Sequence, residues 1–435
     1  MAIAKRGIVL GATAFVLSAV AVTGVGIHLS PQGQAFLRPS PKELVDEVWQ
    51  VIDKRYVDST FNQQDWTAVR KDYLDRKYEK NEDAYEAIRE MLEKLEDPYT
   101  RFMDPEEFQN MKIDTSGELT GVGIQLAQDE ETKKLVVVSP IEDTPAFRAG
   151  IQSKDVISKI DGQTTKGMDI NEAVRLIRGK PGSQVTLTIL RGEEGKDRKE
   201  MDFTITRARI EIHPVRYSKR SSPEGQIGYI RLTQFSAIAA QEMRDAIRDL
   251  EKQKVTGYVL DLRSNPGGLL DASIDIARMW LDRGTIVSTV NRLGTSDLRE
   301  ARGNALTEKP LVVLVDGGSA SASEILSGAL QDHKRAKIVG TKTFGKGLVQ
   351  SVQPLSGGAG LAVTIAKYLT PDGRDINKAG IEPDIAVPLT EKDKERFTED
   401  RTRIGTMEDP QFAKAVEILG QEIKAQRGQH ALSSP

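Results

Sequence analysis

The spacing of apolar residues changes along the chain, and its first stretch is helical. Apolar residues recur at three- and four-residue intervals from Leu44 to Tyr56 and again from Tyr85 to Leu95. The second stripe stops at Asp97-Pro98, because a residue that precedes proline is biased away from helical backbone angles. We therefore predict a small helical unit over residues 39–112.

The next stretch has the period of β-strands. Apolar residues from Val122 to Leu126 alternate with glycine or polar residues, and two short helical patterns, Pro145–Gly150 and Ile170–Ile177, interrupt the series. We predict a compact, partly open β-barrel over residues 113–208. Its further strands are expected at Leu135–Val138, Val156–Ile160, Val185–Ile189 and Phe203–Ile205.

From about Glu211 onward, strand and helix patterns alternate, which favours an α/β layer structure over residues 209–390. The predicted fold class is therefore α+β multidomain, with a charged extension over residues 391–435 that holds an amphipathic helix near Phe412–Ile423. Core strands are expected at Ile227–Leu232, Gly257–Leu262, Thr285–Val290, Leu311–Val315, 337–340, 348–353 and 361–366. Core helices are expected at Ala237–Gln253, Leu269–Leu281 and Ser321–Asp332.

The first 38 residues read as a targeting segment. Lys5 and Arg6 precede an uncharged run from Gly7 to Leu29, which is long enough to span a bilayer and also rich in small residues. A cleaved signal peptide and a retained membrane anchor both remain open. In either case the positive charge before the run predicts that the body is exported to the extracytoplasmic side.

Composition removes several classes of chemistry. The 435 residues carry a net charge of -3, which does not favour nucleic acid as a partner. Cysteine is absent, so disulfides, thiol catalysis and cysteine metal sites are excluded. The four histidines share no metal-ligand spacing, and we expect no metal and no other cofactor. They are His28, His213, His333 and His430.

A serine-rich turn is the first candidate for catalysis. The apolar strand Leu311–Val315 runs into a glycine pair and then a small-residue helix start with serines at 319, 321 and 323. A helix N-terminus favours negative charge through its backbone N–H groups and its dipole. Glu324 follows Ser321 by three residues, which is also the spacing of an ordinary capping box. On residue spacing alone, any of the three serines could be the nucleophile.

A lysine between two glycines is the second candidate. Lys346 has apolar neighbours that could keep it dry, and a lysine must be desolvated and neutral to act as a base. On a strand, Lys346 and Gln350 would share one face, so that Gln350 could accept a hydrogen bond from the amine. A serine and a lysine without histidine suggest Ser-Lys catalysis. Taken singly, a lysine is more often a solvated surface charge, and a glutamine in this position is more often a polar residue at a strand edge.

The segment Leu260–Gly268 supplies a third element, a strand that ends in Asn-Pro-Gly-Gly. Such a turn is common, and a routine turn is the simplest interpretation. The functional alternative is half of an oxyanion hole, in which the backbone N–H groups of Gly267 and Ala322 stabilise developing negative charge.

Residues 119–124, Leu-Thr-Gly-Val-Gly-Ile, resemble the carboxylate-binding loop of PDZ domains, and Thr144–Ile151 and Asp155–Gly162 look like the companion segments. The resemblance implies that backbone N–H groups of this loop bind the terminal carboxylate of a peptide, which then adds as a strand beside the following helix. The implied peptide-binding residues are Gly121, Val122, Gly123 and Ile124.

Together these pieces resemble the carboxy-terminal processing (tail-specific) peptidase family. The match rests on Asp261–Gly268, Gly318–Ile325, Thr343–Gly347 with Gln350, and the upstream Asp97–Pro105. The resemblance implies a crotonase/ClpP-like core, with Ser321 as nucleophile, Lys346 as base and Gln350 as its orienter. It also implies a serine endopeptidase that cleaves near the C-termini of protein substrates in the periplasm or thylakoid lumen, without a cofactor. Glu324 fits the family pattern, and we assign it to helix capping.

Two other functions compete with this interpretation. One is a catalytically silent PDZ adaptor, tethered to a membrane if the N-terminal segment is uncleaved. The other is a Ser-His-Asp hydrolase that uses His333 or His213. His333 lies one helix length from Ser321, about 18 Å along the axis, which disfavours this hydrolase. The oligomeric state is not encoded in any pattern that we find.

Overall fold

The computed structural model describes residues 40–116, 118–129, 132–141, 144–192, 198–294 and 296–433. They form two compact units, one over residues 118–212 and the other over residues 40–116 and 213–433. The expected leader or anchor, residues 1–38, lies outside the described residues. Within the described ranges, no helix has both the length and the apolar character that crossing a bilayer demands.

A six-stranded sheet is the centre of the larger unit, with the order β10-β11-β12-β15-β16-β19. All neighbouring pairs are parallel except β10 with β11. Its strands are β10 (Val215–Ser222), β11 (Gly225–Leu232), β12 (Tyr258–Asp261), β15 (Leu311–Val315), β16 (Lys337–Gly340) and β19 (Ile385–Ala386). Every residue of β15 is buried, as expected for a strand covered on both faces.

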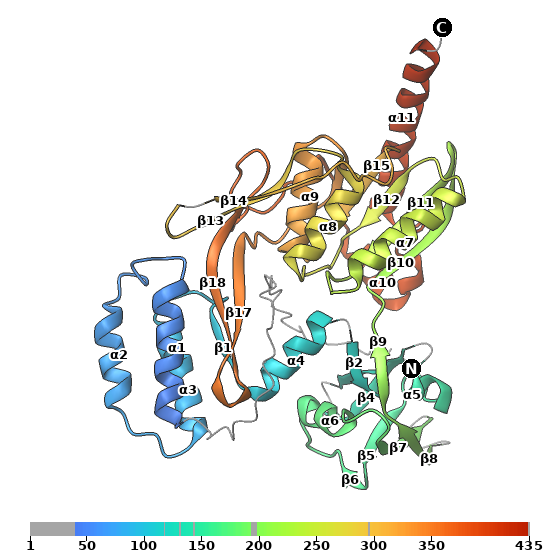
Figure 1. Ribbon diagram of the computed structural model, residues 1–435. Coiled ribbons are helices and arrows are strands. Elements are labelled where there is room, and N and C mark those ends of the chain that lie inside the picture. Colours follow the sequence, from blue (N-terminus) through green and yellow to red (C-terminus); the bar gives the residue numbers. More distant parts are fainter. Residues whose placement is uncertain are drawn as a thin grey trace. The chain divides into compact units, whose positions relative to one another are not determined.

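Helices cover both faces of this sheet (Figure 1). Three of them pack on one face: α7 (Ala239–Lys252), α8 (Leu270–Trp280) and α9 (Ala322–Asp332). On the other face, Val312 and Leu314 pack against Phe412 and Leu419 of α11 (Pro410–Ser433). The C-terminal segment, which also holds α10 (Glu391–Glu399) and the 3-10 turn η2 (Arg401–Arg403), therefore supplies a complete layer of the core.

A long hairpin connects this core to the N-terminal helices. Its strands β17 (Leu348–Pro354) and β18 (Gly360–Leu369) flank the turn η1 (Ser356–Gly358) and join a five-stranded sheet. The other strands are β1 (Arg101–Met103), β13 (Thr285–Asn291) and β14 (Ser296–Glu300). The apolar stripes of the helices pack on Leu361 and Val363 of the hairpin. These helices are α1 (Pro41–Arg55), α2 (Trp66–Asp75) and α3 (Asn81–Glu93), and α4 (Pro105–Ser116) follows β1.

The smaller unit contains the predicted series of short strands with two helices, which is confirmed. Its sheet has the order β3-β4-β5-β7-β8, with β6 paired to β5, so β3 lies at one edge. The elements are β3 (Ile124–Gln128), β4 (Leu135–Pro140), α5 (Pro145–Ala149), β5 (Val156–Ile160), β6 (Gln163–Thr164), α6 (Ile170–Ile177), β7 (Gln184–Arg191) and β8 (Lys199–Thr206). A separate ribbon of β2 (Glu118–Gly121) and β9 (Ala208–Glu211) brings the two ends of the unit together.

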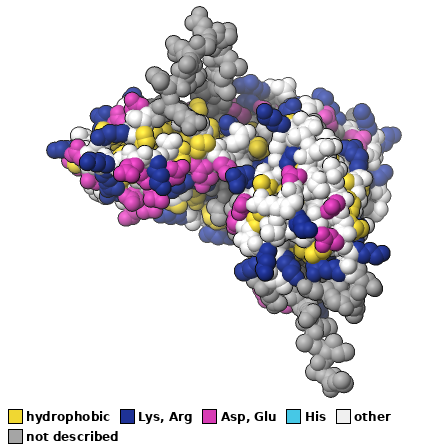
Figure 2. Space-filling model, turned by 90° about the horizontal axis from the view of Figure 1, so that it is seen from below, with side chains coloured by type: hydrophobic (Ala, Val, Ile, Leu, Met, Phe, Trp, Pro, Cys, Tyr) yellow, Lys and Arg dark blue, Asp and Glu magenta, His cyan; other side chains and the backbone are white. Residues whose placement is uncertain are grey.

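The face drawn in Figure 2 carries charges of both signs. On the face seen in Figure 2, basic and acidic side chains are interspersed, with small hydrophobic patches among them. The 61 basic and 64 acidic residues of the chain nearly cancel. This face therefore presents no field of a single sign.

Candidate active site

Ser321 occupies a strained turn between β15 and α9. It is the N-cap of α9, with φ 53° and ψ -111°, a region that non-glycine residues rarely adopt and that costs about 1–3 kcal/mol. The side chain is fully buried, and its Oγ has no hydrogen-bond partner among the described residues. A serine hydroxyl held on a sharp strand-to-helix turn is the geometry of a nucleophile.

The hydroxyls of the two neighbouring serines, Ser319 and Ser323, make structural hydrogen bonds to the backbone. Ser319 Oγ donates to the carbonyl oxygen of Leu262 at 2.8 Å, and Ser323 Oγ donates to that of Asn265 at 2.9 Å. Both hydroxyls hold the Leu262–Asn265 segment against the turn. The contacts therefore separate Ser321 from the other two serines, which residue spacing alone did not.

Glu324 connects the serine turn to the lysine loop. Its buried carboxylate accepts hydrogen bonds from the N–H groups of Ser321 (2.8 Å), Gly345 (2.7 Å) and Lys346 (2.9 Å), and from the Thr343 hydroxyl (2.6 Å). Ser321 and Lys346 share one oxygen, Oε2, so their backbones lie within two hydrogen-bond lengths of each other. Burial raises the pKa of Glu324, and these four hydrogen bonds oppose the rise. Glu324 therefore does more than cap α9. No pattern in the sequence predicted its hydrogen bonds to the loop of Thr343, Gly345 and Lys346.

Lys346 is buried beside an aromatic ring. Its side chain is 3% exposed, and Nζ lies 4.6 Å from the centroid of the Tyr99 ring. Burial, together with the charge of Arg101, lowers the pKa of Lys346 to about 8, although the carboxylates of Asp97 and Glu324 oppose the change. A lysine in this environment is partly neutral near neutral pH, which a general base requires.

The backbone around Lys346 differs from the strand that we expected. Lys346 lies in a loop before β17, and the β17–β18 register shifts between Val349 and Gln350. A Cβ at Gly347 would lie 2.3 Å from the backbone nitrogen of Asn377, so only glycine permits this close approach. Strand alternation therefore does not place Lys346 relative to Gln350.

Gln350 is almost completely buried on β17. Its Nε2 donates to Thr364 Oγ1 at 3.4 Å, and its Oε1 is buried without a partner among the described residues. A buried amide oxygen with no donor is unusual, because leaving it unpaired costs free energy. This oxygen is available as an acceptor for an amine.

Gly267 lies directly against the serine turn. A Cβ on Gly267 would approach the Ala320 carbonyl oxygen to 2.7 Å and the Ala322 nitrogen to 2.9 Å. The two residues expected to form an oxyanion hole are therefore neighbours. The N–H of Gly267 donates to Asn265 Oδ1 at 2.9 Å, so an oxyanion would have to share or replace that contact.

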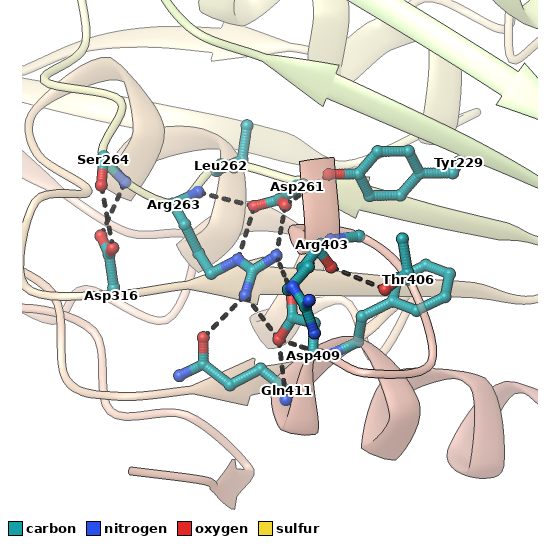
Figure 3. Close-up of polar contacts among 12 residues, drawn as sticks. Tyr229, Asp261, Leu262, Arg263, Ser264, Asp316, Arg403, Thr406, Asp409 and Gln411 are labelled. Atoms are coloured by element: carbon teal, nitrogen blue, oxygen red, sulfur yellow. Dashed lines mark hydrogen bonds and ion pairs between the residues drawn. The ribbon is translucent and has the colours of Figure 1, made fainter. Parts of the chain in front are cut away.

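A buried ion cluster anchors the strand end that leads to Gly267 (Figure 3). Arg263 donates to Asp261 and also to Asp409 and Gln411, which belong to the C-terminal segment. The Arg263 guanidinium holds the pKa of Asp261 below its ordinary value, although burial acts to raise it. On the other side, the Ser264 N–H donates to Asp316 at 2.8 Å. The sequence showed Asp261 and Arg263 within a motif but gave no sign of Asp409.

The loop expected to bind a peptide carboxylate lies in the smaller unit. Gly123 has φ 83°, and a Cβ there would lie 2.3 Å from Thr144 Cβ, so this position requires glycine. The Val122 carbonyl accepts from the Ala146 N–H at 2.9 Å, which fixes the loop to α5. Gly121 ends β2 and Ile124 begins β3.

The histidines have other partners. His213 Nδ1 pairs with Glu242 Oε1 at 2.5 Å at an exposed position, and His333 Nε2 bonds to the Thr285 carbonyl at 2.7 Å. Ser321 Oγ, by contrast, is unpartnered within the described ranges, so neither histidine is hydrogen-bonded to it. Across those ranges no group of three or more His, Asp or Glu side chains is arranged for a metal ion.

The buried Ser321 turn and the buried Lys346 are the features expected of a serine hydrolase in which a lysine replaces the histidine. Comparison with known proteins agrees with this class. The model of peptidase family S41 matches residues 226–387, and a PDZ domain model matches residues 136–191.

The relatives extend the match over most of the chain. It is 47% identical over 365 residues to the carboxyl-terminal-processing protease of Synechocystis sp., which covers 84% of this chain and 85% of that protein. It is 42% identical to carboxyl-terminal-processing peptidase 2 of Arabidopsis thaliana (84% and 72% covered) and 38% identical to a carboxy-terminal processing protease of Bacillus subtilis (74% and 67%). A solved structure of a photosystem II D1 C-terminal processing protease is 39% identical, with a TM-score of 0.53, over 80% of this chain and 93% of that one.

The chain therefore belongs to the carboxyl-terminal-processing proteases of peptidase family S41. It is a serine-type C-terminal peptidase with a PDZ domain, and the predicted family, fold class and enzyme class are confirmed.

Proposed function

We propose that this protein cleaves exported proteins near their C-termini through Ser321, with Lys346 as the base and Gln350 as the group that orients the amine. One observation carries the proposal. The backbone N–H groups of Ser321 and of the buried Lys346 donate to the same oxygen of Glu324, and the buried Ser321 hydroxyl has no partner among the described residues.

The mechanism follows from these groups. The Lys346 amine takes the proton of Ser321 as Oγ attacks the carbonyl carbon of the scissile bond. The resulting ammonium then gives that proton to the leaving amine, and an acyl-enzyme remains. Water, deprotonated by the same amine, attacks the ester and releases the new C-terminus. Gln350 holds the amine through its Oε1 during both steps.

The N–H groups of Gly267 and Ala322 are the proposed oxyanion hole. They flank Ser321, as the close approach of Gly267 to the Ala322 nitrogen requires. The contact from Gly267 to Asn265 keeps this N–H satisfied while the site is empty. Losing one such donor lowers kcat by about 10²–10³.

The PDZ domain is proposed to bind the substrate tail. Backbone N–H groups of Gly121, Val122, Gly123 and Ile124 would bind the terminal carboxylate, and the peptide would add along β3. The position of β3 at the edge of its sheet supports this, because an edge strand offers unpaired backbone groups.

The proposed substrates are precursors of exported or membrane-bound proteins with C-terminal extensions. The 39% identity to a photosystem II D1 C-terminal processing protease supports a reaction-centre precursor as one such substrate. The uncharged run after Lys5 and Arg6 supports an extracytoplasmic location, in the periplasm or the thylakoid lumen. It would also hold the enzyme at the membrane if it is not cleaved.

The experiment compares variants on a peptide that carries a free C-terminal tail. Ser321→Ala and Lys346→Ala should each abolish cleavage with the melting temperature unchanged within a few degrees. Lys342→Ala is the matched control, because Lys342 is an exposed lysine of the same loop that pairs with Glu382. A Lys346→Ala enzyme as active as the control would contradict the mechanism. A wild-type protein that binds tails but never cleaves them would favour the silent adaptor.

A further inference from the structure

The proposed role of Gln350 depends on which way its amide points. An amide presents an acceptor on one side and two donors on the other. Only Oε1 can accept a hydrogen bond from the Lys346 amine. If the amide were flipped, the N–H groups of Nε2 would face the N–H groups of the amine, and no hydrogen bond could form. Some part of the structure must therefore fix this amide.

A chain of hydrogen bonds leads from Gln350 to the N-terminal helical segment. Gln350 Nε2 donates to Thr364 Oγ1 at 3.4 Å, and the hydroxyl oxygens of Thr364 and Thr100 lie 3.3 Å apart. Thr100 Oγ1 donates to Asp97 Oδ2 at 2.7 Å and accepts from the Thr364 N–H at 3.0 Å. Thr100, Thr364 and Gln350 are 4%, 0% and 1% exposed, so water does not compete for these groups.

The Asp97 carboxylate at one end of this chain of hydrogen bonds determines which group donates at each step. A carboxylate only accepts, so the Thr100 proton goes to Asp97 at the shortest of these contacts. The Thr100 hydroxyl is also placed to donate to Thr364 Oγ1, so Thr364 Oγ1 is an acceptor both toward Thr100 and toward an N–H of Gln350. The amide nitrogen is thus committed to Thr364. Its oxygen, which has no partner among the described residues, is left for the lysine.

The same segment contacts the lysine directly. Tyr99 lies between Asp97 and Thr100, and its ring centroid is 4.6 Å from Lys346 Nζ. The next residue, Arg101, begins β1 and pairs with Ala362 of β18, which holds the segment in register with Thr364. The Asp97 carboxylate also accepts from the Tyr99 N–H at 3.0 Å, so the turn is rigid at both of its functional positions.

We propose that Asp97 and Thr100 are positioning residues of the peptidase site, which act through Thr364 to hold the Gln350 amide with its oxygen toward Lys346. The inference rests on the proposed role of Gln350. It gives the N-terminal helical segment a part in the chemistry, although that segment is more than 200 residues from the serine in sequence.

The first test removes the Thr100 hydroxyl at nearly constant shape. Thr100→Val should lower kcat for tail-peptide cleavage about tenfold and leave KM within about twofold, because the amide is no longer fixed. Thr100→Ser restores the hydroxyl and should recover most of the rate. The matched control is Thr60→Val, since the Thr60 hydroxyl bonds to Asp58 in the same way but at an exposed loop. The control should have wild-type kcat.

The second test separates positioning from general stability. In a Gln350→Ala background, Thr100→Val should change kcat by less than about twofold, because the group on which it acts is gone. Equal losses in both backgrounds would overturn the inference, as would a Thr100→Ser enzyme no better than Thr100→Val. A Gln350→Ala enzyme with wild-type kcat would also overturn it. Cleavage by Ser321→Ala would refute the proposed function by a separate measurement.

Discussion

At the residue scale, the proposed chemistry depends on the Lys346 amine being neutral. Because burial lowers the pKa of Lys346 to about 8, the neutral fraction falls about tenfold for each pH unit below that value. We therefore expect kcat/KM to rise with pH and to reach a plateau above a midpoint near 8. Initial rates of peptide cleavage from pH 5.5 to about 10 would show this limb. A rate that fell through the same range would contradict a lysine base.

Substitutions of Arg101 test what sets the midpoint of this pH–rate profile. The groups that act on the Lys346 amine include the Arg101 guanidinium, the Tyr99 ring, and the carboxylates of Asp97 and Glu324. Arg101→Met removes a nearby positive charge but keeps an apolar stem, so the midpoint should move to higher pH. Arg101→Lys keeps the charge and should leave the midpoint in place. A midpoint that is unmoved in Arg101→Met would show that burial alone sets the pKa.

At the element scale, the C-terminal segment fixes the end of β12, which leads to the proposed oxyanion loop. Arg263 is buried between Asp261 of β12 and Asp409, just before α11 (Figure 3). Breaking one side of a buried ion cluster leaves an uncompensated charge, which costs about 3–5 kcal/mol. We expect Asp409→Asn to lower the free energy of unfolding by about that amount and to reduce cleavage.

Denaturant unfolding of Asp409→Asn and Asp400→Asn provides the comparison. Asp400 lies in the same segment but pairs with Arg403 at the surface, and an exposed pair contributes only about 0–1 kcal/mol. The control should therefore keep both stability and activity. Equal stability of the two variants would mean that Gln411 and Asp261 suffice to hold Arg263.

The elements also show how far sequence patterns reach. The apolar run of β15 and the small-residue helix α9 could be predicted, because both are buried along almost their whole length and their composition reflects it. The exposed, polar β14 could not, since it has no apolar alternation. Family resemblance selected Ser321 as the candidate nucleophile. The contact between Thr100 and Thr364, in contrast, joins residues 264 positions apart. Only tertiary folding brings such pairs together, so no local pattern encodes them.

At the scale of the whole molecule, the smaller unit is an insertion with adjacent ends. Glu118 pairs with Glu211 across the β2–β9 ribbon, so the chain enters and leaves this unit at one place. Its core forms one cluster: Leu135, Val137, Ile157 and Leu187 pack together, and every described member of this cluster belongs to the same unit. On the other side, the Ala237 N–H donates to the Thr115 carbonyl at 3.1 Å, which anchors the exit from α4 within the larger unit.

We therefore expect each unit to fold without the other, because neither depends on the other for its core. Residues 117–212 expressed alone should unfold cooperatively and bind a peptide with a free C-terminal carboxylate more tightly than its amidated form. Gly123→Ala should weaken that binding, because alanine at φ 83° would collide with Thr144.

In the complementary protein, a short glycine linker replaces residues 118–211. It should keep a folded core in which Lys346 retains its lowered pKa, while tail selectivity is lost. Failure of this protein to fold would show that the PDZ domain contributes to the core's stability.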